Sequence, residues 1–123
     1  MMLSLSMQTQ AADVDLAGVV EGAQAVDERV PHGQTLARFA EAVVLGSDEE
    51  LASARDAVVA AVGPAGFVDA ACVVGNFERM VRVAGATGIP LDASAVDATT
   101  ELREALGLNE YAMAARTLGG AEE

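Results

Sequence analysis

Apolar residues recur along most of this chain at intervals of three and four residues, which is the spacing of one face of an α-helix. The clearest stretch has apolar residues at i, i+3, i+4, i+7 and i+8, namely Leu36, Phe39, Ala40, Val43 and Val44. No run alternates between apolar and polar residues, as a half-buried strand would. The pattern predicts an all-α fold, a compact bundle of five to six helices.

Glycine and proline divide this pattern into segments. They are concentrated at 30–33, at Gly46, at Gly63-Pro64 and at 88–90, which are the positions expected of turns and helix ends. The predicted helices cover about 13–29, 35–45, 48–62, 65–86, a stretch capped by Asp92 or Ser94 that ends at Leu106, and a short one at 109–117. They form one domain over 11–118, between a flexible lead-in at 1–10 and a flexible acidic tail at 119–123.

The third and fourth helices carry the most specific signals. Ser47 stands three residues before Glu50, which is the spacing of a capping box, and the residues between them are acidic, as the start of a helix favours. The fourth helix is apolar almost all round, which predicts that it lies in the centre of the fold or at an interface. Its broadest apolar face is Phe67, Ala70, Ala71, Val74, Phe77, Val81 and Ala84.

The amino-acid composition favours an interface shared with another chain. Hydrophobic residues are 52% of the chain, but most are Ala and Val, with three Phe, one Tyr and no Trp. Small side chains bury little area each, so association with another copy or a partner subunit would add stability.

Charge excludes some partners. The formal net charge is −12, all basic residues are Arg, and an acidic surface repels both nucleic acid and anionic membranes. No stretch approaches the ~18 uninterrupted apolar residues of a membrane span. We therefore expect no nucleic-acid or membrane partner, and a cytoplasmic location.

Glu78 is the most informative candidate residue. Helical geometry places it within the apolar face of the fourth helix, where a carboxylate needs a partner. Arg82 follows at i+4, in the favourable order for an ion pair, and Arg79 and Asn76 are close in sequence. Either Glu78 belongs to a structural ion pair, or Glu78, Arg79, Arg82 and Asn76 surround an apolar cavity that takes a small ligand.

The remaining reactive side chains are few. Cys72 is the only cysteine and lies among apolar residues, so we expect an inert core thiol, and His32 is the only histidine, in a Pro-His-Gly turn. One Cys and one His form no conventional zinc site, and no phosphate-binding glycine loop is present. We predict no metal and no cofactor.

The stretch 75–84, followed by Thr87-Gly88-Ile89-Pro90-Leu91-Asp92, resembles the C-terminal part of alkylhydroperoxidase-D-like proteins, the carboxymuconolactone decarboxylase superfamily. Segments 38–42 and 54–57 fit the same pattern, so the resemblance covers about 35–92. It implies an all-helical fold and a homo-oligomer. The peroxidatic members use a Cys-x-x-Cys pair with a nearby His and an upstream Glu, which this chain lacks. Redox peroxidase activity is therefore not expected.

Three functions follow as hypotheses. The first is a non-catalytic, self-associating helical protein of this kind. The second is a small-molecule binder or non-redox, decarboxylase-like enzyme that uses Glu78 and the nearby Arg residues. The third is an acidic module that binds a basic protein, because twelve net negative charges favour such a partner.

Overall fold

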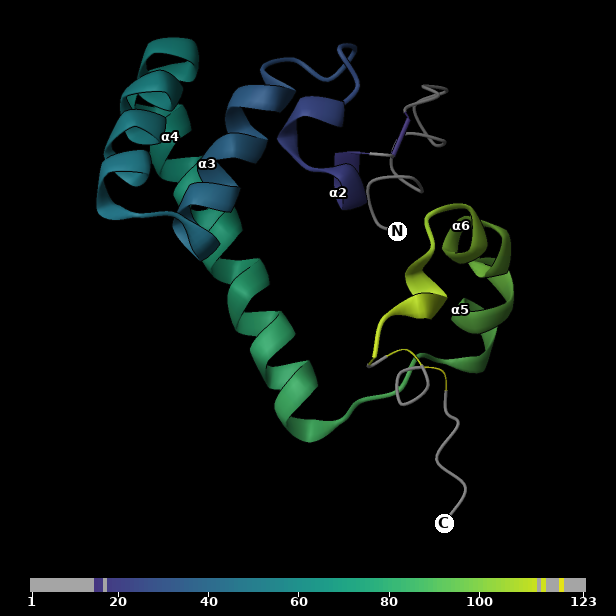
Figure 1. Ribbon diagram of the computed structural model, residues 1–123. Helices are drawn as coiled ribbons and strands as arrows, with labels where there is room; N and C mark the ends of the chain where they lie inside the picture. Colours follow the sequence, from purple (N-terminus) through teal and green to yellow (C-terminus); the bar gives the residue numbers. More distant parts are fainter. Residues whose placement is uncertain (1–14, 17, 113, 115–117, 119–123) are drawn as a thin grey trace. The chain divides into compact units, whose positions relative to one another are not determined.

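A computed structural model describes residues 15–16, 18–112, 114 and 118 of the chain. The regular elements within these ranges are all helical, with no strand, which confirms the all-α prediction (Figure 1). The chain divides into an N-terminal unit, Met1–Phe77, and a C-terminal unit, Glu78–Glu123. The segments predicted to be flexible, 1–10 and 119–123, lie outside the described residues, and the single domain over 11–118 stays a prediction.

The described elements are α-helices and short 3₁₀ helices. In chain order they are α2 (Gly18–Glu21), η1 (Ala23–Ala25), α3 (Gly33–Leu45), α4 (Asp48–Thr87), α5 (Ala93–Ala98), α6 (Thr100–Ala105) and η2 (Leu108–Glu110). Within the described ranges, four α-helices have six residues or more, fewer than the five to six predicted. The helix predicted over 13–29 is reduced to short elements, and the segments on either side of Gly63 are counted together as α4.

The prediction of one helix over 13–29 is wrong for the residues of this range that the structure describes. The predicted helix is replaced by α2 and η1, which are separated by Gly22, whose positive φ of 91° favours glycine. The backbone N–H of Ala23 then donates a hydrogen bond of 2.8 Å to Oε1 of Glu41, on α3. This bond satisfies a donor that a continuous helix would have used internally, so the break at Gly22 ties η1 to α3.

The core of the N-terminal unit forms between α3 and α4. Phe39 on α3 is 2% exposed, and Val58 on α4 is fully buried. Ala42 is also buried, whereas Val43 and Val44 are exposed, so α3 is rotated from the face that its apolar pattern favoured. The inward face of the 48–62 segment is formed by four residues that are buried or half-buried: Leu51, Ala54, Val58 and Val62.

The long helix α4 is interrupted at Gly63. This residue has φ 76° and ψ 173°, a conformation that is not helical, and Pro64 follows it. The chain turns back at this point (Figure 1), so α4 consists of an N-terminal segment, 48–62, and a C-terminal segment, 64–87. Phe67 in the C-terminal segment packs edge-to-face on Phe39, with ring centroids 5.6 Å apart. Gly63-Pro64 thus separates two helical segments, as the sequence predicted.

The helix predicted to end at Leu106 is divided into α5 and α6. The division falls at Thr99, whose hydroxyl donates a 2.6 Å hydrogen bond to the carbonyl oxygen of Ala95. Such a bond competes with the regular helix ladder and favours a local break. Arg103 on α6 is 9% exposed, and its Nη2 donates to the carbonyl oxygen of Val96 on α5 at 3.0 Å.

The sixth predicted helix, 109–117, lies only partly within the described residues. Its start coincides with η2, a single 3₁₀ turn over Leu108–Glu110. Tyr111 has an extended backbone with ψ 140°, so the predicted helix is interrupted after this turn. Residues 113 and 115–117 lie outside the described residues.

Two glycines of α4 provide a matched test of the reversal. A Cβ at either Gly63 or Gly75 would meet no atom within 4 Å, so substitution by Ala changes only backbone preferences. We expect Gly63→Ala to destabilise the protein by about 1–3 kcal/mol, because its backbone conformation is nearly restricted to glycine. We expect Gly75→Ala, inside a helix, to stabilise it by up to about 1 kcal/mol. Urea unfolding measures both, and equal effects of the two substitutions would contradict the non-helical backbone at Gly63.

Candidate functional site

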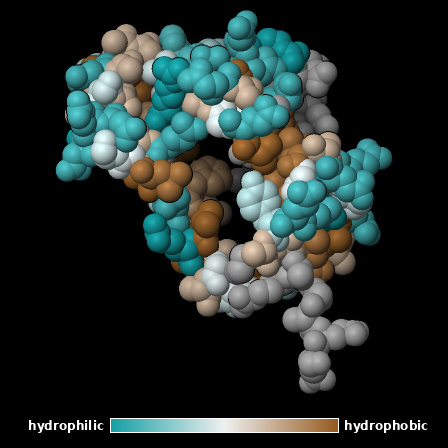
Figure 2. Space-filling model, viewed as in Figure 1, coloured by the Kyte–Doolittle hydropathy of each residue, from teal (hydrophilic) through white to brown (hydrophobic). Residues whose placement is uncertain are grey.

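The most distinctive surface feature is a set of exposed hydrophobic side chains on the C-terminal segment of α4. Val73 is 57% exposed, Phe77 48% and Val81 64%. We call the full set the α4 apolar surface: Val68, Val73, Phe77, Met80, Val81 and Val83. Figure 2 shows hydrophobic residues open to solvent on the viewed face of the molecule. The exposure of these side chains argues against a central position for this segment, and its role in an interface stays a prediction.

By length and composition, α4 is a helix that could cross a membrane, the one such helix among the described residues. An 18-residue window within it has a mean hydropathy of 2.0, and only 6% of that window is buried. This low burial shows that the apolar residues are not hidden within the chain's own core. The reversal at Gly63 interrupts the helix, and the uncharged stretches 57–68 and 70–77 are each shorter than the ~20 residues that span a bilayer.

Glu78 and Arg82 are brought together by the structure. Nη2 of Arg82 donates to Oε2 of Glu78 at 3.2 Å, one helical turn away. The Glu78 side chain is one-third exposed and that of Arg82 is 79% exposed, so the pair is a surface ion pair rather than a buried one. Asn76 and Arg79 are exposed on the same helix. Such a pair contributes about 0–1 kcal/mol, and a binding role of these four residues stays a prediction.

Cys72 was expected in the core, and this expectation is wrong. Its side chain is exposed, because it lies on the outer side of the C-terminal segment of α4 rather than toward α3. His32 is exposed at the start of α3, with φ 56°. No group of three or more His, Cys, Asp or Glu side chains within the described ranges is placed to hold a metal ion.

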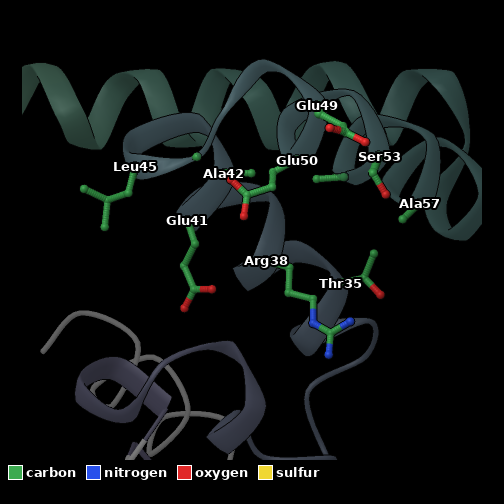
Figure 3. Close-up of a pocket in the computed structure, with 11 residues that line it drawn as sticks. Thr35, Arg38, Glu41, Ala42, Leu45, Glu49, Glu50, Ser53 and Ala57 are labelled. Atoms are coloured by element: carbon green, nitrogen blue, oxygen red, sulfur yellow. The ribbon is translucent and has the colours of Figure 1, made fainter.

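An open cleft of about 780 Å³ lies between α3 and the N-terminal segment of α4 (Figure 3). Arg38 is its one basic residue, and three carboxylates accompany it. The cleft is lined by Thr35, Arg38, Glu41, Ala42, Leu45, Gly46, Glu49, Glu50, Ser53, Ala54 and Ala57. The sequence did not predict this cleft. Arg38 entered the sequence analysis only as part of segment 38–42, which fits the family resemblance. The ionisable side chains of the cleft are its three carboxylates and Arg38, and nothing in their arrangement assigns them a reaction.

Two of the carboxylates in this cleft already have structural partners. Glu41 binds the backbone of Ala23, and Glu50 forms the capping box that the sequence predicted. The backbone N–H of Ser47 donates to Oε2 of Glu50 at 2.8 Å, the Ser47 hydroxyl lies 2.9 Å from the same oxygen, and the Glu50 N–H donates to the Ser47 hydroxyl at 3.3 Å. The backbone bond first, and then the hydroxyl, lower the pKa of the Glu50 carboxyl below its ordinary value.

Comparison with known proteins gives no family assignment: no protein-family model matches the chain, and no curated protein or solved structure matches it either.

The capping box predicts a defined pH dependence. Because the pKa of Glu50 is lower in the folded protein than in the unfolded chain, its ionised form favours folding. The resulting advantage of the wild type over Glu50→Gln is complete above the unfolded pKa, near pH 4.5, and is lost as the pH falls through the folded value.

Urea unfolding of both proteins over this acidic range measures the difference. Glu49→Gln, which removes a charge from the same helical turn without removing a capping contact, is the matched control. A difference between the wild type and Glu50→Gln that is independent of pH would show that the Glu50 charge does not contribute through the cap.

Proposed function

We propose that this chain is a non-catalytic helical subunit that acts by self-association, and that the α4 apolar surface is the contact surface. The observation that carries the proposal is the exposure of Phe77, Met80 and neighbouring valines along one ordered helix. Several large apolar side chains exposed on one helix are typical of interaction sites, because covering them releases water from hydrophobic side chains.

The small core of the N-terminal unit supports the proposal. Among the described residues of this unit, the buried hydrophobic ones are Ala23, Phe39, Ala42 and Val58, and Phe39 is the one large side chain of these four. A core of this size provides little stability, while large side chains such as Phe77 stay outside it. Association would cover these side chains and raise the stability of the folded chain by mass action.

The distribution of charge favours α4 as the place where two copies approach. Between residues 65 and 87 the charged side chains are Asp69, Glu78, Arg79 and Arg82, which balance each other. The net charge of −12 is therefore carried by the rest of the chain. Other surfaces of two copies repel each other, whereas this segment adds no net repulsion.

The resemblance to alkylhydroperoxidase-D-like proteins agrees with this proposal, since it implies a helical scaffold and a homo-oligomer. The missing Cys-x-x-Cys pair and histidine motivate the non-catalytic part. We include a cytoplasmic location in the proposal, because the reversal at Gly63 and the charges at 78, 79 and 82 disfavour α4 as a membrane span.

Substitution of Phe77 tests the proposal. We expect the wild-type chain to sediment as a dimer or larger species, and Phe77→Asp to sediment as a monomer at the same concentration, because a buried unpaired carboxylate at the contact is costly. Leu45→Asp is the matched control: Leu45 is 86% exposed at the end of α3, outside the α4 apolar surface, and its substitution should leave association unchanged. Circular dichroism confirms that each variant folds. A monomeric wild type, or a Phe77→Asp variant that still associates, would overturn the proposal.

A further inference from the structure

Residues 22–30, which contain η1 and the turn that follows it, are tied to the middle of α3 by a carboxylate. The backbone N–H of Ala23 donates to Oε1 of Glu41 at 2.8 Å, and Ala23 itself is 4% exposed. Bonds within the segment, such as that from the Ala25 N–H to the Gly22 carbonyl oxygen, maintain its local conformation. The bond to Glu41 instead holds the segment against α3.

The backbone of Gly22 allows this contact. Its φ of 91° favours glycine, and a Cβ at this position would lie 3.1 Å from Oε1 of Glu41. Little else buries the segment, since η1 is a single turn of three residues and Ala23 is the one buried residue between 22 and 30. A segment with so little buried apolar surface opens at a lower free energy than the core does.

Arg38 offers Glu41 a second partner. The two residues are three apart on α3, a spacing that places both side chains on one face of the helix, and Figure 3 shows them extending to the same side of α3. Both are exposed and line the open cleft. Within the part of the chain that the structure describes, the Arg38 side chain forms no hydrogen bond or ion pair. Its charge is therefore available to Glu41 when the bond to Ala23 breaks.

We infer that Glu41 is a latch with two alternative partners. In the docked state it accepts the hydrogen bond from Ala23, and residues 22–30 lie against α3. In the lifted state it pairs with Arg38, and the segment moves away from α3 and exposes Ala23. The pair with Arg38 lowers the free energy of the lifted state, so the two states differ less than they would if Glu41 had no other partner.

This latch couples the position of the segment to the cleft, because Arg38 and Glu41 both line it. The inference is independent of the proposed self-association, whose contact surface is on the C-terminal segment of α4. Every residue of the latch lies in the N-terminal unit.

Thiol labelling of a buried cysteine measures the lifting of the segment. In a Cys72→Ser background, Ala23→Cys introduces a thiol that N-ethylmaleimide reaches when the segment lifts, and it keeps the backbone N–H that bonds to Glu41. Val58→Cys in the same background reports opening of the core, because Val58 is fully buried. We expect position 23 to be labelled at least about tenfold faster than position 58, as local opening costs less than global unfolding.

Two further substitutions distinguish the partners of Glu41. Glu41→Ala removes the latch and should raise the labelling rate at position 23 about tenfold, because a hydrogen bond to a charged group is lost. Arg38→Gln removes the competing partner and should lower this rate about twofold, which is the effect of one ion pair on a helix surface. Arg55→Gln is the matched control, since it removes the same charge from α4 outside the cleft and should leave the rate unchanged.

Equal labelling rates at positions 23 and 58 would overturn the inference, because the segment would then open only together with the core. A rate at position 23 that does not rise in Glu41→Ala would overturn it as well, and so would a rate that does not fall in Arg38→Gln. Circular dichroism establishes that each variant folds. Hydrogen exchange of the Ala25 amide, in chains that keep Ala23, repeats the comparison of Glu41→Ala with Arg38→Gln without the introduced thiol.

Discussion

The backbone of Gly63 is the constraint on which the arrangement of α3 and α4 depends. Its non-helical conformation turns the chain back, so that the segments on both sides of it meet α3. Val58 precedes the reversal and is fully buried, and Phe67 follows it and packs on Phe39. A continuous straight helix would extend away from α3 after the first segment, because each residue adds 1.5 Å along the axis. The small core thus depends on one residue that tolerates an unusual backbone conformation.

The contact with α3 involves the start of the C-terminal segment of α4. Phe67 packs there on Phe39, whereas Phe77 and Val81, farther along the same apolar face of the helix, are exposed. The small residues of this protein limit what its own core contains, and the large apolar residues that remain lie on a segment without net charge. The exposed apolar side chains and the low net charge of this segment are the two features on which the proposed self-association rests.

Local signals in the sequence predicted local structure well. The spacing of Ser47 and Glu50 predicted a capping box, and Gly63-Pro64 predicted a break, because these motifs depend only on neighbouring residues. The exposure of Cys72 and the rotation of α3 toward Ala42 were not predictable, since apolar periodicity does not show which apolar face has a partner in the same chain. For Glu78, the spacing to Arg82 predicted the ion pair, but its burial was overestimated for the same reason. The cleft beside Arg38 depends on how two helices meet, which no local motif encodes.

Hydrogen–deuterium exchange at low and high protein concentration tests the central claim most directly. If a second copy covers the C-terminal segment of α4, amides between residues 64 and 87 exchange more slowly at the higher concentration, while those of α3 and of the 48–62 segment change less. This result would show that the contact between copies lies on the C-terminal segment of α4, where the exposed hydrophobic side chains are. Exchange between residues 64 and 87 that does not depend on concentration, in a sample shown by sedimentation to associate, would contradict the account.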